Sequence, residues 1–456
     1  MSVLILHRNP FRPFPYQEWL TGRTGDVVVL AARDKLGLPG EEVPDGGDLG
    51  FTRLEVFDDF DAEAVDTRAL ELAEEFRVTH VVAHHEADVD RAARLRERLG
   101  LDGAWTEDVR PFRDKLLMKR LARQAGIEVA PHVLAHTADE AREFAGRYGL
   151  PLVCKERAGY NSVGLRILRD EDDLESCLAD VFPGPPRDDV LLEAFVPGRM
   201  CHVDGLVVDG RTVAAWPSQY QYDLSSFAAD PGPRVDLTLD PDDPLTPRLL
   251  DLVDRVLTAL RPAGTRLRDH AFHAEVFHTP DGRLVLCEIA CRSGGAKIRE
   301  VFRTMFGIHL AQYVTRAEAG MPLPGFEDGV GDGPPPRPRC MSGQVLTMKR
   351  PGLVRALPEI PDDPWVEGFW LFAEPGQVIA PASGSADFLT AAVASAPTRA
   401  ECERRLRGLG ARVQAGTEIV PVGAEDEGGP ADAGADGPRA GAADDARTAT
   451  EIAVTS

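Results

Sequence analysis

The chain has 456 residues, of which 43% are hydrophobic and 27% charged, a composition typical of a globular protein with two or three domains. Its 51 basic residues are outnumbered by 74 acidic ones, which gives a formal net charge of −23 at pH 7. Nucleic acid and anionic membrane surfaces attract basic proteins, so neither is expected as a partner.

Targeting segments and disulfides are not indicated. The N-terminal apolar run Val3–Leu6 is followed by a histidine and an arginine, and is too short for a signal peptide or a membrane helix. The seven cysteines are scattered, without a CxxC pair, which favours neither a disulfide framework nor a structural zinc site. We expect a cytoplasmic protein.

Residues 1–110 alternate between strand and helix patterns, which predicts a parallel α/β domain. It contains no GxGxxG, so a Rossmann dinucleotide site is not supported. His84 and His85, followed by Glu86, do not fit a helical HExxH pattern, and we interpret the two histidines as a loop pair. The predicted strands are 2–7, 26–32 and 78–85, and the predicted helices are 61–76 and 88–100.

Residues 111–200 predict a central subdomain of mixed helices and strands. Thr137 precedes a helical pattern as an N-cap. The predicted helices are 113–127, 137–149 and 170–182, and the predicted strands are 128–135, 150–156 and 189–198.

Residues 201–328 predict a third unit, built around two hairpins. Asp209-Gly210 marks the turn of a hairpin over 202–218, and a second hairpin covers 272–290. A helix is predicted over 244–262 and one long helix over 297–320.

The remaining residues divide into three parts. The Pro/Gly-rich segment 329–339 predicts a linker, and the residues up to 421 a small α+β subdomain. Residues 422–456 are rich in Gly, Ala and Asp, and we expect a disordered acidic tail because they offer little apolar surface to bury.

The second hairpin carries a glutamate on each strand, Glu275 and Glu288. Antiparallel pairing across the turn 279–283 brings them together, and two adjacent carboxylates repel unless a cation lies between them. Mg²⁺ prefers carboxylate oxygens and is often shared with nucleotide phosphates. The alternative is two outward-facing glutamates on an edge hairpin.

A candidate anion site follows the second glutamate. Arg292 offers a planar fork of donors, and Gly294 and Gly295 allow close approach of backbone N–H groups to a ligand. A salt bridge from Arg292 to one of the glutamates is compatible with this role. Lys155 precedes a loop with glycines at 159 and 164, a pattern suited to phosphate binding, although no GxxxxGK[ST] motif is present.

Four motifs in this order resemble the ATP-grasp superfamily: DKLLMKRLARQAGIEVAP, LPLVCKERAGYNSVGLRI, LLEAFVPG and FHAEVF…LVLCEIACRSGG. The resemblance covers roughly residues 1–420. It implies an ATP-grasp fold of α/β and α+β class, with a parallel N-terminal (pre-ATP-grasp) domain, a central ATP-binding subdomain, and a C-terminal metal-site and lid region.

The resemblance implies roles for individual residues. Arg292, Gly294 and Gly295 would bind the transferring phosphate, with Arg292 also stabilising the oxyanion of the tetrahedral intermediate. The residues implied to contact ATP or metal are Lys115 and Lys155 (phosphates), Ser162 (ATP), Glu193 and the backbone near Phe195 (adenine side), and Glu275 and Glu288 (Mg²⁺, with Mn²⁺ as an alternative).

This chain departs from the family pattern at two positions. Many members have an asparagine metal ligand two residues after the second glutamate, where this chain has Ala290. That pattern is closer to the L-amino-acid ligase (dipeptide synthetase) branch. Met200 replaces a glutamate that contacts the ribose in the family, and His202 is our substitute for it.

We therefore expect an ATP- and Mg²⁺-dependent ligase that joins a small-molecule carboxylate to an amine through an acyl phosphate. Amino acids or similar molecules are the expected substrates, and residues 216–226 are expected near their site. The alternatives are an ATP-grasp enzyme with another acceptor, such as a carboxylase or nucleotide-biosynthesis enzyme, and a catalytically silent nucleotide-binding regulator. A homodimer is the family expectation.

Overall fold

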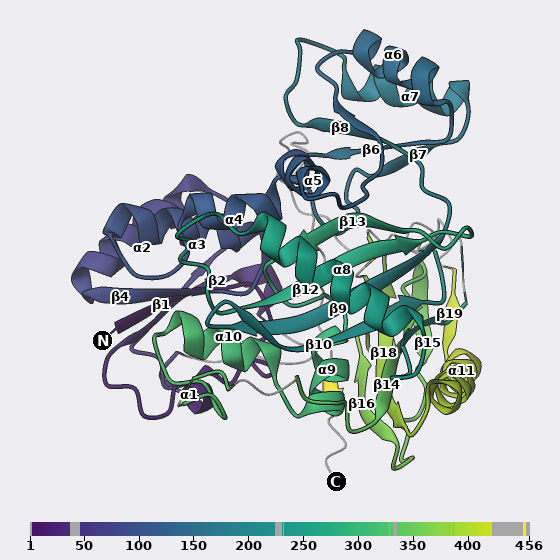
Figure 1. The fold of residues 1–456 in the computed structure, drawn as a ribbon. Coiled ribbons are helices and arrows are strands. Elements are labelled where there is room, and N and C mark those ends of the chain that lie inside the picture. Colours follow the sequence, from purple (N-terminus) through teal and green to yellow (C-terminus); the bar gives the residue numbers. More distant parts are fainter. Residues whose placement is uncertain are drawn as a thin grey trace, which may run out of the picture.

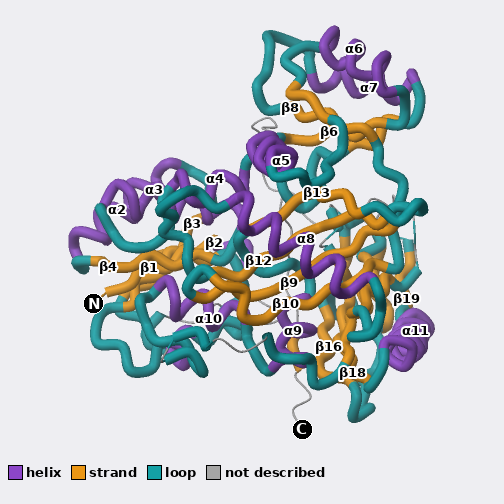
Figure 2. The backbone as a smooth tube through the Cα atoms, viewed as in Figure 1, coloured by secondary structure: helices purple, strands orange, loops and turns teal. Residues whose placement is uncertain are grey.

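The computed structural model describes residues 2–36, 46–223, 230, 232–327, 329–331, 335–382, 384–385, 387–421 and 450–452. Three parts are visible in Figure 1: an N-terminal α/β unit, a small subdomain that stands apart from the rest, and a large sheet to which the C-terminal segment contributes. Figure 2 shows that helices flank the strands of each part.

The N-terminal unit is a four-stranded parallel sheet in the order β3-β2-β1-β4, as the alternating patterns predict. Helices α2 and α3 cover one face, and α1 and α10 pack on the other. Its elements are β1 (Ser2–His7), α1 (Tyr16–Trp19), β2 (Val27–Ala32), the 3-10 helix η1 (Arg33–Lys35), β3 (Arg53–Phe57), α2 (Glu63–Glu75), β4 (Val78–Ala83) and α3 (Glu86–Leu99).

The central subdomain is an antiparallel sheet in the order β5-β8-β6-β7, with α6 and α7 buried against it. The Thr137 side chain accepts from the Glu140 amide, so it caps α6 as predicted. Its elements, with the two helices that lead into it, are α4 (Thr106–Arg113), α5 (Lys115–Gln124), β5 (His132–Leu134), α6 (Ala138–Tyr148), β6 (Leu152–Glu156), β7 (Arg166–Leu168), α7 (Glu171–Val181) and β8 (Val190–Ala194).

The large sheet has nine strands in the order β13-β12-β9-β10-β11-β14-β18-β16-β20. Its first strands and helices are β9 (Arg199–Val208), β10 (Arg211–Tyr220), β11 (Arg234–Thr238), α8 (Leu245–Leu260), β12 (His270–His278), β13 (Leu284–Ala290), α9 (Ile298–Phe306) and α10 (Leu310–Glu318). Helix α8 packs on one face of β9 and β12, and α9 packs on the opposite face.

The C-terminal segment continues this sheet. It contains β14 (Met341–Met348), β15 (Gly352–Ala356), β16 (Val366–Leu371), β17 (Val378–Ile379), β18 (Phe388–Ala396), α11 (Arg399–Gly416), β19 (Glu418–Val420) and β20 (Thr450–Ile452). Strands β15, β17 and β19 form a separate small sheet. The boundary predicted at residue 329 therefore does not coincide with a break in the large sheet.

Three local predictions need correction, and some elements were not predicted. The helix predicted over 297–320 is two helices, α9 and α10, because Gly307 ends the first at φ +72°. Only His132–Leu134 of the strand predicted over 128–135 is regular, and α1, β3, α4, β7 and β11 were not predicted. In the tail predicted to be disordered, Thr450–Ile452 pairs with β16, while 422–449 and 453–456 lie outside the described residues.

Candidate active site

A cavity of about 560 Å³ lies between the central subdomain and the edge of the large sheet. Its walls come from α5, from β6, β7 and β8, and from β9, β12 and β13. Seven of the predicted site residues line it: Lys115, Lys155, Ser162, Glu193, Phe195, Glu275 and Glu288.

Glu275 and Glu288 are direct cross-strand partners in the hairpin of β12 and β13. The turn has Gly282 at φ +83°, a conformation that favours glycine. Lys115 Nζ lies 3.4 Å from Glu288 Oε2. Burial raises the pKa of Glu288, but Lys115 and Lys155 outweigh it and the pKa is lowered, so the carboxylate stays ionised. The paired carboxylates therefore face the cavity beside a lysine.

A second charged group lies deeper in the cavity. The Glu193 carboxylate, on β8, is 3.0 Å from Lys155 Nζ and 3.1 Å from Lys119 Nζ. Burial raises the pKa of Glu193, but the two lysines lower it to about 2. Burial lowers the pKa of Lys155, and Glu193 reverses this so that the pKa is raised. Lys155 is therefore held as an ammonium ion.

Lys119 was not among the predicted site residues. It lies one helical turn after Lys115 on α5 and is 0% exposed. Its Nζ also donates to the carbonyl of Cys287 at 3.0 Å, the residue before Glu288. Lys119 therefore connects β8 of the central subdomain with β13 of the large sheet.

The glycine-containing loop after β6 closes one side of the cavity. Asn161 and Ser162 both have φ +56°, and Lys115 Nζ donates to the carbonyl of Gly159. Asp114 caps α5 by accepting from two backbone amides at 3.1 Å, and it binds Arg157 at 2.6 Å. The start of α5 and the start of the loop are thus tied together.

Apolar side chains line the part of the cavity near the end of β8. Phe195 is 39% exposed, and its backbone amide donates to the carbonyl of Pro151 at 3.3 Å. Met200, which replaces the expected glutamate, also lines this part. The surface is suited to the flat face of an aromatic base.

Arg292 lies outside this cavity and borders a smaller one of about 30 Å³. Its Nε binds Glu86, and its Nη1 donates to the carbonyl of Ser293 at 2.8 Å. Glu86 also binds Arg113. Burial raises the pKa of Glu86, but the two arginines lower it to about 2. The salt bridge considered for Arg292 thus exists, but with Glu86 of α3 and not with a hairpin glutamate.

Gly294 and Gly295 do not line the large cavity among the residues described. A Cβ at Gly294 would lie 2.8 Å from Asp204 Oδ1, whereas one at Gly295 would meet open space. A side chain is therefore excluded at Gly294 but not at Gly295. The group that lies close to Gly294 is the Asp204 side chain and not a ligand.

His202 does not line the cavity either. It is 1% exposed, its Nδ1 lies 2.6 Å from Asp204, and its Nε2 lies 3.0 Å from Asp236. Burial lowers the pKa of His202, but Asp236 and Asp204 raise it to about 10. Both nitrogens are already engaged, so the predicted ribose contact has no basis in this geometry.

Other residues near the cavity were only partly foreseen. Tyr220 and Tyr222, in the segment 216–226 expected near the site, line it, whereas residues 224–226 lie outside the described residues. Arg407 of α11 also lines the cavity, and its position in an ordinary charged helix gave no signal.

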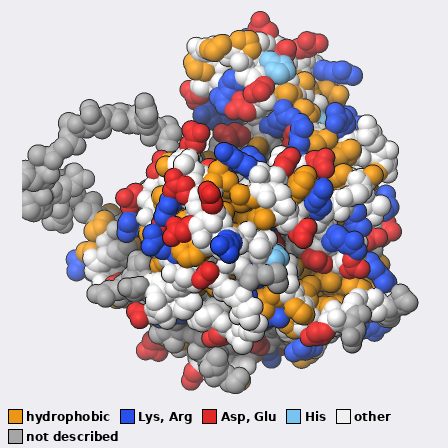
Figure 3. Space-filling model, turned by 90° about the vertical axis from the view of Figure 1, so that its left-hand side faces the viewer, with side chains coloured by type: hydrophobic (Ala, Val, Ile, Leu, Met, Phe, Trp, Pro, Cys, Tyr) orange, Lys and Arg blue, Asp and Glu red, His pale blue; other side chains and the backbone are white. Residues whose placement is uncertain are grey.

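In the described part of the chain, no helix is long and apolar enough to cross a membrane. On the face shown in Figure 3, acidic and basic side chains are interspersed.

This arrangement, a small subdomain over a large antiparallel sheet with lysines and paired carboxylates between them, is the ATP-grasp fold. Residues 114–209 match the family described as carbamoyl-phosphate synthase L chain, ATP binding domain. The chain can also be superposed on an L-amino acid ligase from Bacillus licheniformis with a TM-score of 0.71, at 18% identity over 92% of this chain and 99% of that one.

Sequence relatives agree with this assignment. An L-arginine-specific L-amino acid ligase from Bacillus subtilis is 25% identical over 51% of this chain and 55% of its own length. A D-alanine–D-alanine ligase A from Chromobacterium violaceum is 30% identical over 41% of this chain and 51% of its own length. The chain thus spans about half the length of these relatives. The predicted fold and the resemblance to ATP-grasp carboxylate–amine ligases, with the L-amino-acid ligase branch among them, are confirmed.

Proposed function

We propose that this protein is an ATP- and Mg²⁺-dependent ligase that forms an amide or peptide bond between amino acids or similar molecules. The observation that carries the proposal is the cavity itself. It gathers Lys115, Lys155, Glu193, Glu275 and Glu288, which come from five different elements, around one space of about 560 Å³.

The charges around the cavity are suited to a nucleotide triphosphate. The two lysines lie where phosphate oxygens would need positive charge, and Phe195 and Met200 offer apolar surface for a base. Because the pKa of Lys155 is raised, its ammonium group can stabilise the charge on a phosphate that is being transferred. The loop around Ser162 lines the cavity, and we propose that it covers the phosphates.

The donor set of Glu275 and Glu288 fits Mg²⁺, which prefers hard oxygen ligands and usually keeps phosphate and water ligands as well. When bound, Mg²⁺ would neutralise phosphate charge and polarise the transferring group. Lys115, 3.4 Å from Glu288, keeps that carboxylate ionised and available as a ligand.

The proposed reaction has two steps. A substrate carboxylate oxygen attacks the γ-phosphorus, the bond to the β-phosphate oxygen breaks, and ADP leaves with an acyl phosphate formed. The amine nitrogen of the second substrate then attacks the carbonyl carbon, phosphate leaves, and the nitrogen loses a proton. We propose that Arg292, which borders the neighbouring smaller cavity and interacts electrostatically with Glu288, stabilises the phosphate and the oxyanion when the substrates are bound.

Two relatives support amino acids as substrates: the L-amino acid ligase named above and an alanine–anticapsin ligase from Bacillus subtilis, which is 23% identical over 55% of this chain and 56% of its own length. A second candidate is an ATP-grasp enzyme with another acceptor. It is favoured by structural similarity to a biotin carboxylase domain from Hydrogenobacter thermophilus, with a TM-score of 0.63 at 16% identity over 92% of this chain and 90% of that one.

A release assay separates these functions. The protein is incubated with ATP, Mg²⁺ and pairs of amino acids, or with bicarbonate, and ADP formation is followed with mass detection of products. The proposal expects ADP only with particular pairs, together with a product lighter than the sum of both by one water. ADP formation with bicarbonate alone supports the second candidate. ATP binding without ADP formation in any mixture favours a nucleotide-binding regulator.

We further propose a cytoplasmic protein with small-molecule partners, in line with seven cysteines that are all free in the structure. A homodimer is proposed by analogy with the family, and the mass of the protein in solution tests it.

A further inference from the structure

A row of polar side chains extends from the paired glutamates across one face of the large sheet. Residues two apart on a strand share a face, so His273 and Glu275 of β12 lie on the same side. Glu275 is opposite Glu288 on β13, and His273 is opposite Asp204 on β9. The row therefore begins at the proposed metal ligands and continues away from the cavity.

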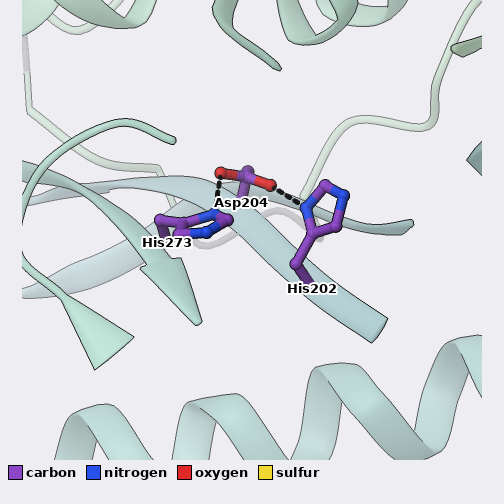
Figure 4. A group of neighbouring side chains, drawn as sticks. All are labelled: His202, Asp204 and His273. Carbon is purple, nitrogen blue, oxygen red and sulfur yellow. Dashed lines mark hydrogen bonds and ion pairs between the residues drawn. The ribbon is translucent and has the colours of Figure 1, made fainter. Parts of the chain in front are cut away.

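Asp204 holds two histidine rings at once (Figure 4). Its Oδ2 lies 2.6 Å from His202 Nδ1, and its Oδ1 lies 2.9 Å from His273 Nδ1. The other nitrogen of His202 is 3.0 Å from Asp236, which also accepts from Gln344 at 3.0 Å. Asp204 is 2% exposed, so these contacts are shielded from water.

The second nitrogen of His273 points towards the cavity side of the row. Its Nε2 lies 3.6 Å from Glu275 Oε1. Because Nδ1 is anchored to Asp204, the ring cannot turn away without breaking a buried hydrogen bond. Asp204 is itself fixed, by His202 on one side and by the close approach of Gly294 on the other.

His202, Asp204 and His273 have the residue types of a metal site. Two ligand atoms around a tetrahedral ion with bonds of about 2.0 Å lie about 3.3 Å apart. The observed separations of 2.6 and 2.9 Å are shorter and are those of hydrogen bonds. The cluster is therefore a hydrogen-bonded network.

We propose that His273 is a positioning residue, held by Asp204, that orients the Glu275 carboxylate for binding a divalent cation. The inference rests on the proposed function, in which Glu275 and Glu288 hold that cation. Groups that orient a metal ligand from outside the coordination sphere typically contribute about 10- to 100-fold to metal affinity. A carboxylate without such a partner adopts several rotamers and binds the ion less well.

Two substitutions of His273 remove its contacts with Asp204 and with Glu275 one at a time. In His273→Asn the amide nitrogen can occupy the place of Nδ1, which keeps the contact with Asp204 and loses the one with Glu275. In His273→Gln it can occupy the place of Nε2, which keeps the contact with Glu275 and loses the one with Asp204. His270→Asn is the matched control, since His270 lies on the same strand, is buried, and has no hydrogen-bond partner for its ring nitrogens among the described residues.

The probe is Mn²⁺, titrated into protein with a non-hydrolysable ATP analogue and followed by the electron paramagnetic resonance signal of the free ion. His273→Asn should weaken Mn²⁺ binding about tenfold or more, while His273→Gln should stay within about threefold of the wild type. His270→Asn should leave the affinity unchanged. Thermal unfolding is measured for every variant, and His273→Ala, which removes the contact with Glu275 and should weaken Mn²⁺ binding equally, replaces His273→Asn if that variant does not fold.

Equal loss in His273→Asn and His273→Gln would overturn the proposal, because it indicates a role in folding alone. Unchanged affinity in both folded variants would also overturn it. A stoichiometric transition metal in the purified wild type that is lost in His273→Asn would show that the cluster is a metal site instead. Glu275→Gln is the reference: if it binds Mn²⁺ normally, the proposed function fails at its metal site, independently of His273.

Discussion

Replacing Glu288 by glutamine tests the metal site with little disturbance of the fold. The Glu288 side chain is 35% exposed, and its ion pair with Lys115 spans 3.4 Å. An ion pair of this exposure contributes about 0–1 kcal/mol, and the substitution also removes repulsion from the opposite carboxylate of Glu275. The free energy of unfolding should therefore change by less than about 1 kcal/mol.

The effect on turnover should be much larger, because a neutral amide replaces a charged ligand of the proposed Mg²⁺. We expect kcat/KM to fall at least about 100-fold, which corresponds to about 2.7 kcal/mol of transition-state stabilisation. ADP release measures the rate, and urea unfolding measures the stability.

Glu156→Gln is the matched control for Glu288→Gln, since Glu156 is an exposed glutamate that lines the same cavity. Its kcat/KM should stay within about threefold of the wild type. A near-normal rate for Glu288→Gln at ordinary Mg²⁺ concentration would refute the assignment of this residue. A decrease of about 2.7 kcal/mol in the free energy of unfolding, equal to the expected loss of transition-state stabilisation, would refute the expectation that Glu288→Gln leaves the fold intact.

Three further predictions concern buried charges. Arg292→Lys should lower kcat/KM by about 10- to 100-fold because lysine lacks the planar fork that binds Glu86 and an anion together, and unchanged steady-state kinetics would count against an anion-binding role. Lys119→Met should destabilise the protein by about 3 kcal/mol in urea unfolding, since it removes one partner of a buried ion pair with Glu193; a change below about 1 kcal/mol contradicts this. The pKa of Glu193 lies near 2 instead of 4.5, so its ionisation stabilises the fold above pH 4.5, and this stability, about 3 kcal/mol, is lost as the pH falls from 4.5 towards 2. Urea unfolding at several pH values measures this. The free energy of unfolding should depend less steeply on pH for Glu193→Gln than for the wild type, and an equal dependence on pH in both proteins would contradict the prediction.

The features that short stretches of sequence determine were predictable. The hairpin of β12 and β13 follows from apolar strand patterns around a Pro-Asp-Gly turn. The turn alone would place Cys287 opposite Glu275, and the observed pairing of Glu275 with Glu288 depends on an irregularity in the register between Glu275 and Val276, which the sequence did not indicate. The break between α9 and α10 had a signal that was missed, since Gly307 lies at a helix C-terminus with φ +72°.

The features that long-range packing determines were not predictable. Arg292 binds Glu86, which is 206 residues away in the sequence and on another domain. The environment of His202 depends on the register of β9 against β12 and on Asp236 of β11, which no local pattern reveals. Lys119 was treated as an ordinary helix residue, because the burial of a lysine depends on partners from β8 and β13.

The most direct test of the central claim, a ligase that acts through an acyl phosphate, uses a carboxylic acid substrate labelled with ¹⁸O in its carboxylate. After turnover with ATP and the amine, the released phosphate is analysed by ³¹P NMR or mass spectrometry. We predict that one ¹⁸O atom from the acid appears in each phosphate released, because the carboxylate oxygen bonded to phosphorus in the intermediate leaves with it. Product formation with unlabelled phosphate would contradict the account.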